Sequence, residues 1–495
     1  MNTPMLRILS GACVLLVLEL SLAACTLGPD FHRPVAALPE QWHGAGSIAT
    51  ENAKAASGTP TSQIVDGALD PQWWDAFHDA ELSSLIARVA SSSLDVKAAS
   101  ARLMQARAAR RITGADAGPS VNGTASYQHA RSSQNGLLDI SGLDGKHDYN
   151  VWQPGLDASW ELDLWGRVRR ENEAADASVE ASADLRRDVL LAALAETASD
   201  YLQLRGVQTQ QRIVEQNLDI ARHSLELTRI RFADGVASHL EMAEAAGQVA
   251  TIEAQLPLLD NQRVHLVNAL SLLMAAPPRA LEDELFADAV IAPLPPRVPA
   301  GVPSELAERR SDIRAAEARL HAATAGIGVA IGDFYPRITL SANLSLQAMH
   351  FGDLDTWSSR MFGFGPALSV PLFDGGRLKG QLALREAQQQ EAAIDFQRVV
   401  LSAWHEVDNA MSDYSTRQMQ RDRLAEAVEQ NRIAFDNAQR QYVAGATDFL
   451  NVLTMQKALL HTQQAYAASS TELAVSLVTL FKALGGGWET TFPAG

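Results

Sequence analysis

Side chains that could act as nucleophiles, acid–base groups or metal ligands are present, but their spacing does not suit those roles. The chain has two cysteines, Cys13 and Cys25, and twelve histidines. No histidine pair falls in an HExxH motif or another metal-binding spacing, and no cysteine beyond Cys25 is present to build a zinc site. Residues 131–148 only distantly resemble a calcium loop, because they lack the ligand at the twelfth position. The glycines of residues 326–332 lack the spacing of a dinucleotide-binding fingerprint. We therefore expect neither an enzyme nor a metal site.

Cys25 stands where one covalent modification is expected. Residues 1–24 resemble a secretory signal, with Arg7 ahead of an apolar run. The sequence Leu-Ala-Ala-Cys that ends at Cys25 is similar to a bacterial lipoprotein box, in which the cysteine becomes the new N-terminus. Its sulfur then carries diacylglycerol and its amino group an acyl chain, and three chains anchor far more firmly than one. Thr26 stands after the cysteine in place of aspartate, which by resemblance to enterobacterial lipoprotein sorting rules implies the outer membrane. The alternative is an ordinary cleaved signal in which Cys25 has no role.

The overall composition is that of a folded, acidic chain. Hydrophobic residues make up 47% and charged residues 20% of the 495 positions, which suits packed cores. The net charge of −17 argues against nucleic acid as a partner, because nucleic acid selects basic surfaces. If acidic residues line a water-filled passage, they would favour cations there. The alternative is that they only keep a large surface soluble. After the signal, no apolar run approaches the ~18 residues of a transmembrane helix.

An internal duplication organises the chain. The motif at residues 95–103 returns, with conservative changes, at residues 312–320, and Gly166-Arg167 returns as Gly376-Arg377. The resulting expected layout is a lipidated tether at 25–66, a first repeat at 67–275, a proline-rich connector at 276–303, a second repeat at 304–484 and a tail at 485–495.

Each repeat contains a stretch in which apolar and polar residues alternate. For example, Leu156, Ala158 and Trp160 alternate with polar or charged neighbours. This period of two predicts β-hairpins at 119–163 and 336–373, with four strands of about ten residues that are apolar on one face and polar on the other. About ten residues is also the length of a membrane-spanning β-strand. A soluble sheet packed on helices is the alternative.

Two proline-free stretches predict unusually long helices. Residues 168–231 and 378–441 would each span about 96 Å. The second carries an alanine-rich apolar stripe of the coiled-coil type. Shorter helices are expected at 81–112, 238–275, 304–333 and 448–484. Pro257 should kink the helix in which it lies.

The long helices end in two similar turns. Gly235 and Gly445 suit the left-handed position that follows a helix. Ser238 and Glu241 have the spacing of a capping box, and Asp448 is the equivalent N-cap of the second turn.

Four strands cannot form a closed wall in lipid. The backbone N–H and C=O groups of a free strand edge would find no water to hydrogen-bond in the hydrocarbon. A closed barrel removes such edges, and about eight strands make the smallest barrel whose interior side chains can fill. Copies of the chain must therefore pool their strands. A dimer would supply eight and a trimer twelve, and the larger barrel can leave an open lumen. The polar strand face would then line water, and the long helices would project into the periplasm.

Six motifs together resemble one known family. They are Cys25-Thr-Leu-Gly-Pro-Asp-Phe-His-Arg-Pro34, Trp73-Trp74-Asp-Ala-Phe77, Pro119-Ser120, Leu162-Asp-Leu-Trp-Gly-Arg167, Pro371-Leu-Phe-Asp-Gly-Gly-Arg377 and Lys482-Ala-Leu-Gly-Gly-Gly-Trp488. The set spans essentially all of the mature chain. It resembles the TolC-like outer-membrane factors of tripartite efflux systems, in their NodT or OprM-type lipoprotein subgroup.

This resemblance implies a mainly helical fold with a membrane β-barrel portion. Three chains would form a twelve-stranded β-barrel on a long periplasmic α-helical barrel, with an equatorial belt of shorter helices. The homotrimer would lie in the outer membrane of a Gram-negative bacterium and passively conduct small toxic compounds or drugs. Its implied partners are a periplasmic adaptor (membrane fusion protein) and an inner-membrane transporter, usually of the resistance-nodulation-division type.

The resemblance also places the two turns at the periplasmic end, which is narrowed at rest and receives the adaptor. The candidate adaptor-binding or gate residues are Arg231, Gly235, Ser238, Tyr442, Gly445 and Asp448. Asp448 is also a candidate for an acidic constriction ring. Ordinary helix capping is the alternative for these residues.

Other functions fit the sequence less well. A duct for metal-ion efflux or for type I protein secretion remains the alternative within transport. Lipidation and the ending at Trp488 disfavour protein secretion, and the lack of Met or His clusters disfavours a dedicated metal role. A purely structural coiled-coil lipoprotein would not need four amphipathic strands. No cofactor is expected beyond the lipid on Cys25.

Overall fold

The computed structural model describes residues 26–34, 62–65, 67–133, 147–287, 294–301 and 305–492. The chain divides into two compact units. The first is assembled from Met1–Pro34, Arg102–Ser182 and Ala315–Phe396, and the second from Val35–Ala101, Ala183–Arg314 and Gln397–Gly495. Each unit takes residues from both halves of the duplication. The repeats are therefore interleaved and do not form two separate domains.

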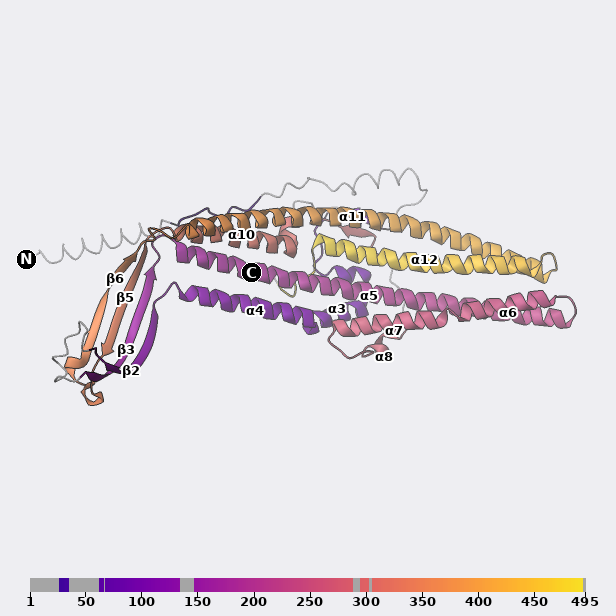
Figure 1. Cartoon of the computed structure of the whole chain (residues 1–495). Helices are drawn as coiled ribbons and strands as arrows, with labels where there is room; N and C mark the ends of the chain where they lie inside the picture. The colour runs from indigo at the N-terminus through magenta and orange to yellow at the C-terminus, as the bar shows by residue number, and fades with distance from the viewer. Residues whose placement is uncertain are drawn as a thin grey trace, which may run out of the picture. The chain divides into compact units, whose positions relative to one another are not determined.

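A four-stranded antiparallel sheet belongs to the first unit (Figure 1). Its strands are β2 (Ser120–Arg131), β3 (Asp148–Leu162), β5 (Arg337–Leu346) and β6 (Arg360–Ser369), paired in the order β2-β3-β5-β6. The hairpins of the two repeats meet where β3 pairs with β5. Among the described strands, β2 and β6 each have one neighbour, so both outer edges of the sheet are free.

Four helices adjoin the sheet. They are α4 (Leu94–Ala115), α5 (Arg167–Ala233), α10 (Ser311–Gly332) and α11 (Arg377–Val443). Asp374 caps α11 by accepting the backbone N–H of Leu378 at 2.8 Å and that of Gly376 at 2.9 Å. These hydrogen bonds, led by that from Leu378, lower the pKa of Asp374. At Gly332 a Cβ would lie 2.9 Å from the Cβ of Arg167, so only glycine allows α10 to approach α5 this closely.

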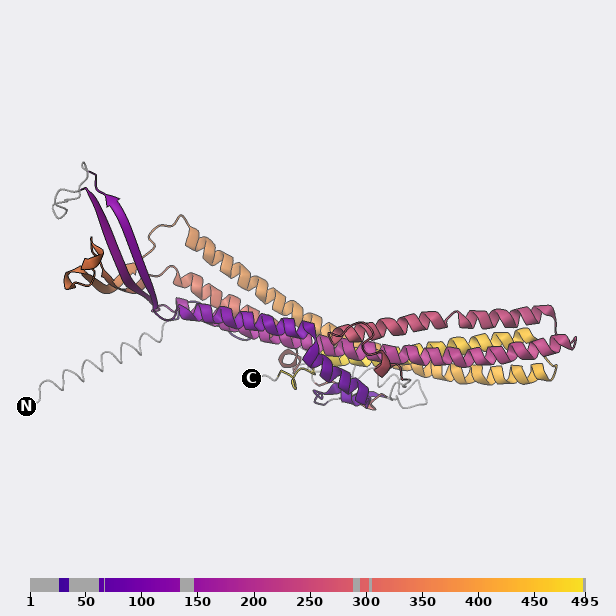
Figure 2. The same ribbon diagram turned by 90° about the horizontal axis from the view of Figure 1, so that it is seen from below.

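The second unit is a helical bundle. In it, α6 (His239–Glu253) and α7 (Leu256–Leu273) lie along α5, and α12 (Phe449–Leu484) lies along α11 (Figures 1 and 2). One core cluster joins Leu225 of α5, Phe435 of α11 and Phe449 of α12, all of them buried. A second core cluster joins Val214, Ile252 and Leu460.

Shorter elements complete the second unit. They are β1 (Gln63–Val65) paired in parallel with β4 (Arg297–Pro299), the 3-10 helix Trp73–Phe77, α3 (Ala80–Ser92), α8 (Glu282–Leu285) and α9 (Leu306–Arg309). The ring of Trp73 stacks on Phe481 at 5.3 Å, and its indole N–H donates to the carbonyl of Gly486 at 3.2 Å. The glycine-rich C-terminal motif is therefore part of the core.

The structure divides three of the helices that the sequence predicts as continuous. The helix expected at 81–112 is split at Ser93, whose backbone is extended and which follows two serines that hydrogen-bond to carbonyls of the preceding turn. The helix expected at 238–275 is split ahead of Pro257, which lies in the first turn of α7 and has no N–H to continue α6. The helix expected at 304–333 begins only at Ser311, after α9 and an extended Arg310.

Among the helices of the described residues, α12 alone is long and apolar enough to cross a membrane. Its most apolar 18-residue window has a mean hydropathy of 1.2, but 61% of that window is buried inside the structure. Burial against protein explains the apolar composition of α12, as it does for a core helix.

Candidate functional site: strand faces, junction and helical turns

One face of the sheet is apolar from edge to edge. The register aligns Gly123 with Leu156, Leu156 with Leu344, and Leu344 with Phe362 in one continuous row. In the next row, the side chain of Phe364 is 85% exposed in the single chain. An exposed apolar surface this broad is typical of a surface that contacts a nonpolar environment. The alternation of apolar and polar residues along its strands is that of β-strands whose apolar face contacts lipid.

The opposite face of the sheet is polar, and Asp157 lies in its middle. Asn122 and Asn343 flank Asp157 on the two neighbouring strands. The hydroxyl of Thr124 donates to a carboxylate oxygen of Asp157 at 3.4 Å, and no cation of the described residues pairs with that carboxylate. This face can therefore line water and attract cations.

Aromatic side chains gather at both ends of the sheet. At the loop end, the ring centroids of Tyr127 and Trp152 lie 4.3 Å apart, and Phe351 approaches Trp152 edge-on at 5.2 Å. At the helix end, the rings of Trp165 and Tyr335 lie 5.3 Å apart. Aromatic girdles at two levels are typical of sheets that cross a membrane.

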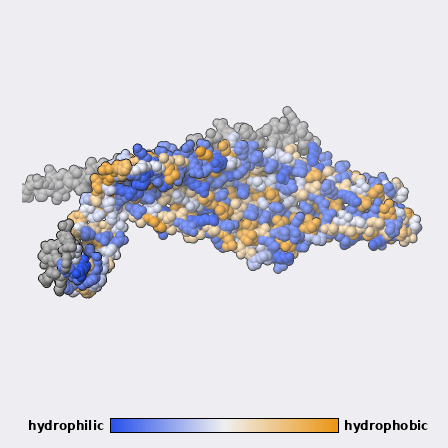
Figure 3. Space-filling view, viewed as in Figure 1, coloured by the Kyte–Doolittle hydropathy of each residue, from blue (hydrophilic) through white to orange (hydrophobic). Residues whose placement is uncertain are grey.

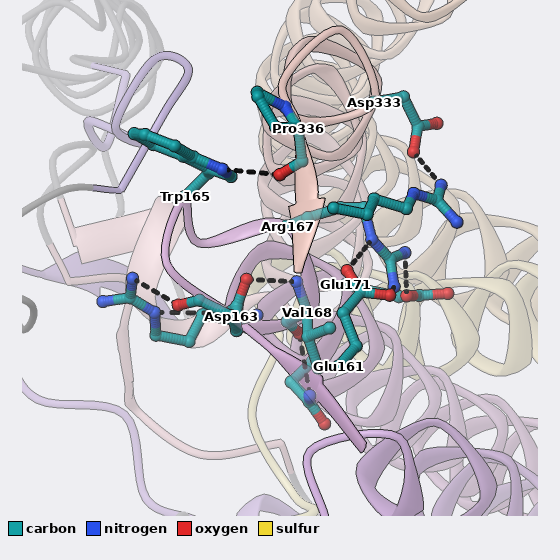
Figure 4. A network of polar contacts seen from close by, with 11 residues as sticks. Glu161, Asp163, Trp165, Arg167, Val168, Glu171, Asp333 and Pro336 are labelled. Carbon is teal, nitrogen blue, oxygen red and sulfur yellow. Dashed lines mark hydrogen bonds and ion pairs between the residues drawn. The ribbon is translucent and has the colours of Figure 1, made fainter. Parts of the chain in front are cut away.

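A network of charges holds the junction between β3 and α5 (Figure 4). Arg167 donates to both carboxylate oxygens of Glu161 at 3.0 Å and to Glu171 at 3.1 Å. Burial lowers the pKa of Arg167, but the bonds to Glu161 and the nearby carboxylate charges outweigh it and leave that pKa above its ordinary value. Asp163 accepts the backbone N–H of Val168 at 3.1 Å and so caps α5. These contacts join the end of β3 to the start of α5.

The described N-terminal residues 26–34 are docked on α5 and α10. Arg170 of α5, with a side chain only 5% exposed, donates to the carbonyl of Leu27 at 3.2 Å and to the carboxylate of Asp30 at 2.5 Å. The hydrogen bond from Arg170 and its positive charge lower the pKa of Asp30. A buried arginine thus binds the first residues that follow Cys25.

Close backbone contact and ring stacking complete this N-terminal seat, the surface formed by Arg170, Gly328 and His321. Gly28 has a φ of 92°, and a Cβ on it would lie 2.5 Å from the Cα of Gly328. Phe31 stacks on His321, with ring centroids 4.4 Å apart and planes at 15°. The seat therefore selects glycine at one point and an aromatic residue at another.

In the second unit, the structure brings Arg231 and Tyr442 together at the two helical turns. Arg231 donates to the backbone carbonyl of Tyr442 at 3.0 Å, and its guanidinium carbon lies 4.5 Å from the centroid of the Tyr442 ring. The ring of Tyr442 also packs on Phe449, at 5.5 Å, in the core of the bundle. The turn after α5 is thereby tied to the turn after α11.

The other four candidate residues serve as caps. Gly235 and Gly445 have φ values of 73° and 74°, with no heavy atom within 4 Å of the position of a Cβ. Ser238 accepts the backbone N–H of Glu241 at 3.2 Å in a capping box, and Asp448 accepts a backbone N–H of α12 at 3.0 Å. These bonds are local, and no hydrogen bond of the described residues joins Ser238 to Asp448.

Exposed apolar side chains surround the turns. Apolar patches lie among the hydrophilic residues at the end of the helices that carries both turns (Figure 3). The exposed fractions of Val236, Leu240 and Val443 are 66%, 66% and 63%. Exposed apolar patches on an otherwise polar surface are typical of sites that bind other proteins.

Two residues of these sites, Asp157 and Arg170, are not among the candidate site residues that the sequence predicts. Asp157 is visible in the alternating pattern, as the one acidic residue between two apolar positions near the middle of its strand. Arg170 has no local signal, because its partner Asp30 lies 140 residues away in the sequence. Cys25 lies outside the described residues, which hold no group of three or more His, Cys, Asp or Glu side chains that could bind a metal ion.

A sheet with one lipid-compatible face, one polar face and two free edges, together with long helices, is typical of a chain of an outer-membrane channel. The chain belongs to the outer membrane efflux protein family, whose model matches residues 85–276 and 302–486. It is a channel component of an efflux system, located in the outer membrane, and its family is one of channels and not of enzymes.

Known relatives agree with this assignment. The pyoverdine export outer membrane protein OpmQ of Pseudomonas aeruginosa is 36% identical over 85% of this chain and 88% of its own length. The outer membrane protein OprJ of the same species is 31% identical over 96% of this chain and 95% of its own. Among solved structures, the outer-membrane channel OprN superposes with a TM-score of 0.86 at 31% identity, covering 94% of this chain and all of that one.

Proposed function

We propose that three copies of this chain close a twelve-stranded barrel that conducts small molecules passively out of the periplasm. The amphipathic four-stranded sheet with two free edges carries this proposal. Its apolar face would meet lipid, its polar face would line the lumen, and edge pairing between copies would satisfy the backbone groups that lipid cannot.

The proposed pump has two further components. A periplasmic adaptor would dock on the channel, and an inner-membrane transporter, usually of the resistance-nodulation-division type, would supply the energy. Relatives are named for pyoverdine export and for toluene efflux. We therefore favour small organic cargo over metal ions or secreted proteins.

Planar-bilayer recording of the purified channel tests the duct itself. The expected result is stepwise conductance from a particle of three chains. A stable, water-soluble monomer without conductance would contradict the proposal.

Cys25 is the proposed site of lipid attachment. The N-terminal seat supports this, because a buried arginine would hold the chain directly after an acylated residue. One relative is named a probable outer membrane lipoprotein. Mass spectrometry of the mature protein should show the lipid, and Cys25→Ser should remove it. An unchanged acylated mass in that variant would refute this assignment.

The pair Arg231–Tyr442 is the proposed clasp of the resting channel, and the exposed apolar residues beside it form the proposed adaptor surface. Loss of the clasp should let the two turns separate. Arg231→Ala should therefore raise the conductance of the isolated channel in planar bilayers.

Tyr442→Phe is a matched control for the clasp. It keeps the ring and the backbone carbonyl that Arg231 binds, and the hydroxyl it removes has no hydrogen-bond partner among the described residues. Its conductance should equal that of the wild type. If the conductance of Arg231→Ala also equalled that of the wild type, Arg231 and Tyr442 would have no role in closing the channel and would only cap the helix ends.

A further inference from the structure

A shallow depression of about 560 Å³ interrupts the apolar face of the sheet toward its loop end. The small residues Gly123, Ala125 and Pro154 line it, together with the larger side chains of Leu156 and Leu344. These five residues, with Leu346 and Arg360, belong to the apolar alternation of their strands, whereas the other three lining residues, Thr124, Gly155 and Ser345, belong to the polar alternation. Because most of the lining is on the apolar face, the depression opens mainly on that side of the sheet.

The types of residue in the sheet produce this depression. Pro154 has no N–H to donate, and the continuous pairing of β3 with β5 ends at Gly155 and Ser345. Pairing returns only as an isolated bridge between Trp152 and Ala348. Opposite Pro154, strand β2 presents Ala125, which is too small to fill the space.

A single cation, Arg360, also lines the depression. Arg360 is the first residue of β6, whose other end leads to α11 (Figure 1). Its alternation with Phe362 and Phe364, and its pairing with Leu346, put it on the apolar face. Its guanidinium carbon lies 4.3 Å from the ring of Trp357, and no carboxylate of the described residues pairs with it. A charge on a lipid-facing surface is costly unless it lies at the interface or meets an anion.

Arg131, a second cation at this end of the sheet, differs from Arg360 because it has a carboxylate partner within the protein. Arg131 follows the apolar alternation of β2 beyond Tyr127, but it pairs with Asp148 at 3.5 Å, and both side chains are more than half exposed. Arg131 is thus neutralised within the protein and lies outside the depression. Arg360 has no such carboxylate partner among the described residues, so it is the cation available to bind an anion from outside the protein.

We propose that this depression and Arg360 bind one phosphorylated glycolipid of the outer leaflet. One acyl chain would lie in the depression, and a phosphate on the sugar headgroup would pair with Arg360. Three observations favour this occupant: the apolar hollow, the cation without a carboxylate partner, and Trp357, which is 77% exposed and suited to the headgroup level. The loop end of the sheet faces the outer leaflet, where lipopolysaccharide is the phosphate-bearing lipid. This inference rests on the proposed membrane insertion, but not on cargo or adaptor.

Lipid binding to the purified full-length channel tests the proposal. Native mass spectrometry would titrate lipid A, dephosphorylated lipid A and phosphatidylglycerol. Wild-type channel should bind lipid A most tightly, and Arg360→Gln should weaken this binding by about tenfold, the size expected for loss of a charged hydrogen bond. Arg360→Lys should keep most of the affinity, and Arg131→Gln should change nothing.

Two further results separate the lipid site from the channel. Ala125→Leu partly fills the depression without removing the charge, so it should also weaken lipid A binding. Planar-bilayer conductance should be the same in all variants, which shows that they fold and insert. Equal binding of lipid A to wild type and Arg360→Gln would overturn the proposal, as would equal wild-type binding of dephosphorylated lipid A or phosphatidylglycerol. A wild-type protein without conductance would instead refute the proposed channel.

Discussion

Asp157 is the residue on which we expect the ion preference of the proposed channel to depend. It lies on the polar strand face between two asparagines, and its carboxylate has a hydroxyl but no cation of the described residues beside it. In a trimer, three such carboxylates would face one lumen. Their field would favour cations within about 10 Å at 0.1 M salt.

Asp157→Asn should therefore reduce the cation preference of the channel. The measurement is the reversal potential across a planar bilayer with a salt gradient, which should shift toward zero, most strongly at low ionic strength. Asp148→Asn is the control, because Asp148 lies at the loop end and is paired with Arg131. A reversal potential that is unchanged in Asp157→Asn would place this strand face away from the conduction path.

At the scale of elements, each turn depends on a residue that tolerates a left-handed backbone. Gly235 has a φ of 73° and open space around the position of a Cβ, so a substitution costs backbone energy only. Gly235→Ala should destabilise the turn by about 1 kcal/mol, and hydrogen exchange there should become roughly fivefold faster.

Gly247 of α6 provides the matched control for that substitution. It also has no heavy atom within 4 Å of a Cβ, but its φ is not positive. Gly247→Ala should stabilise α6 by up to about 1 kcal/mol and slow exchange. Faster exchange in both variants would show that these changes act through something other than backbone conformation.

The N-terminal seat makes an equally local prediction. At Gly328 a Cβ would lie 2.7 Å from the side chain of Arg170 and 2.9 Å from the carbonyl oxygen of Leu27. Gly328→Ala should therefore displace residues 26–34 and expose them to limited proteolysis. Gly326→Ala, one half-turn away with its nearest neighbour at 3.8 Å, should leave the segment protected. Equal protection in the two variants would mean that Gly328 is not needed for docking.

The sequence predicts strands and helices well where apolar residues recur at a regular spacing over a short stretch of chain. Alternation places the four strands, and proline-free apolar stripes place the long helices, because both patterns repeat within a few residues. The helix breaks at Ser93 and Arg310 result from local side-chain hydrogen bonds and from the extended backbone angles of these residues. The spacing of apolar residues does not predict either feature. The contacts of Arg170 with Asp30 and of Arg231 with Tyr442 depend on residues far apart in the sequence, so only the structure reveals them.

At the scale of the whole molecule, the free edges of β2 and β6 are the feature that the proposed assembly must resolve. Within one chain these two strands lie at opposite edges of the sheet. If copies share their strands, β6 of one chain pairs with β2 of the next. The proposed assembly therefore depends on a contact that a single chain cannot make.

Disulfide cross-linking between these two strands tests that contact most directly. The chain has no cysteine after Cys25, so thiols introduced into the strands have few native thiols to compete with them in forming disulfides. Pairs such as Thr124→Cys with Gly363→Cys, scanned along the polar face for register, should give covalent dimers and trimers on oxidation that retain conductance. The single-cysteine variants should give no trimers. Disulfides confined to one chain, or none at any register in a conducting protein, would contradict the proposal that copies share strands to close the wall.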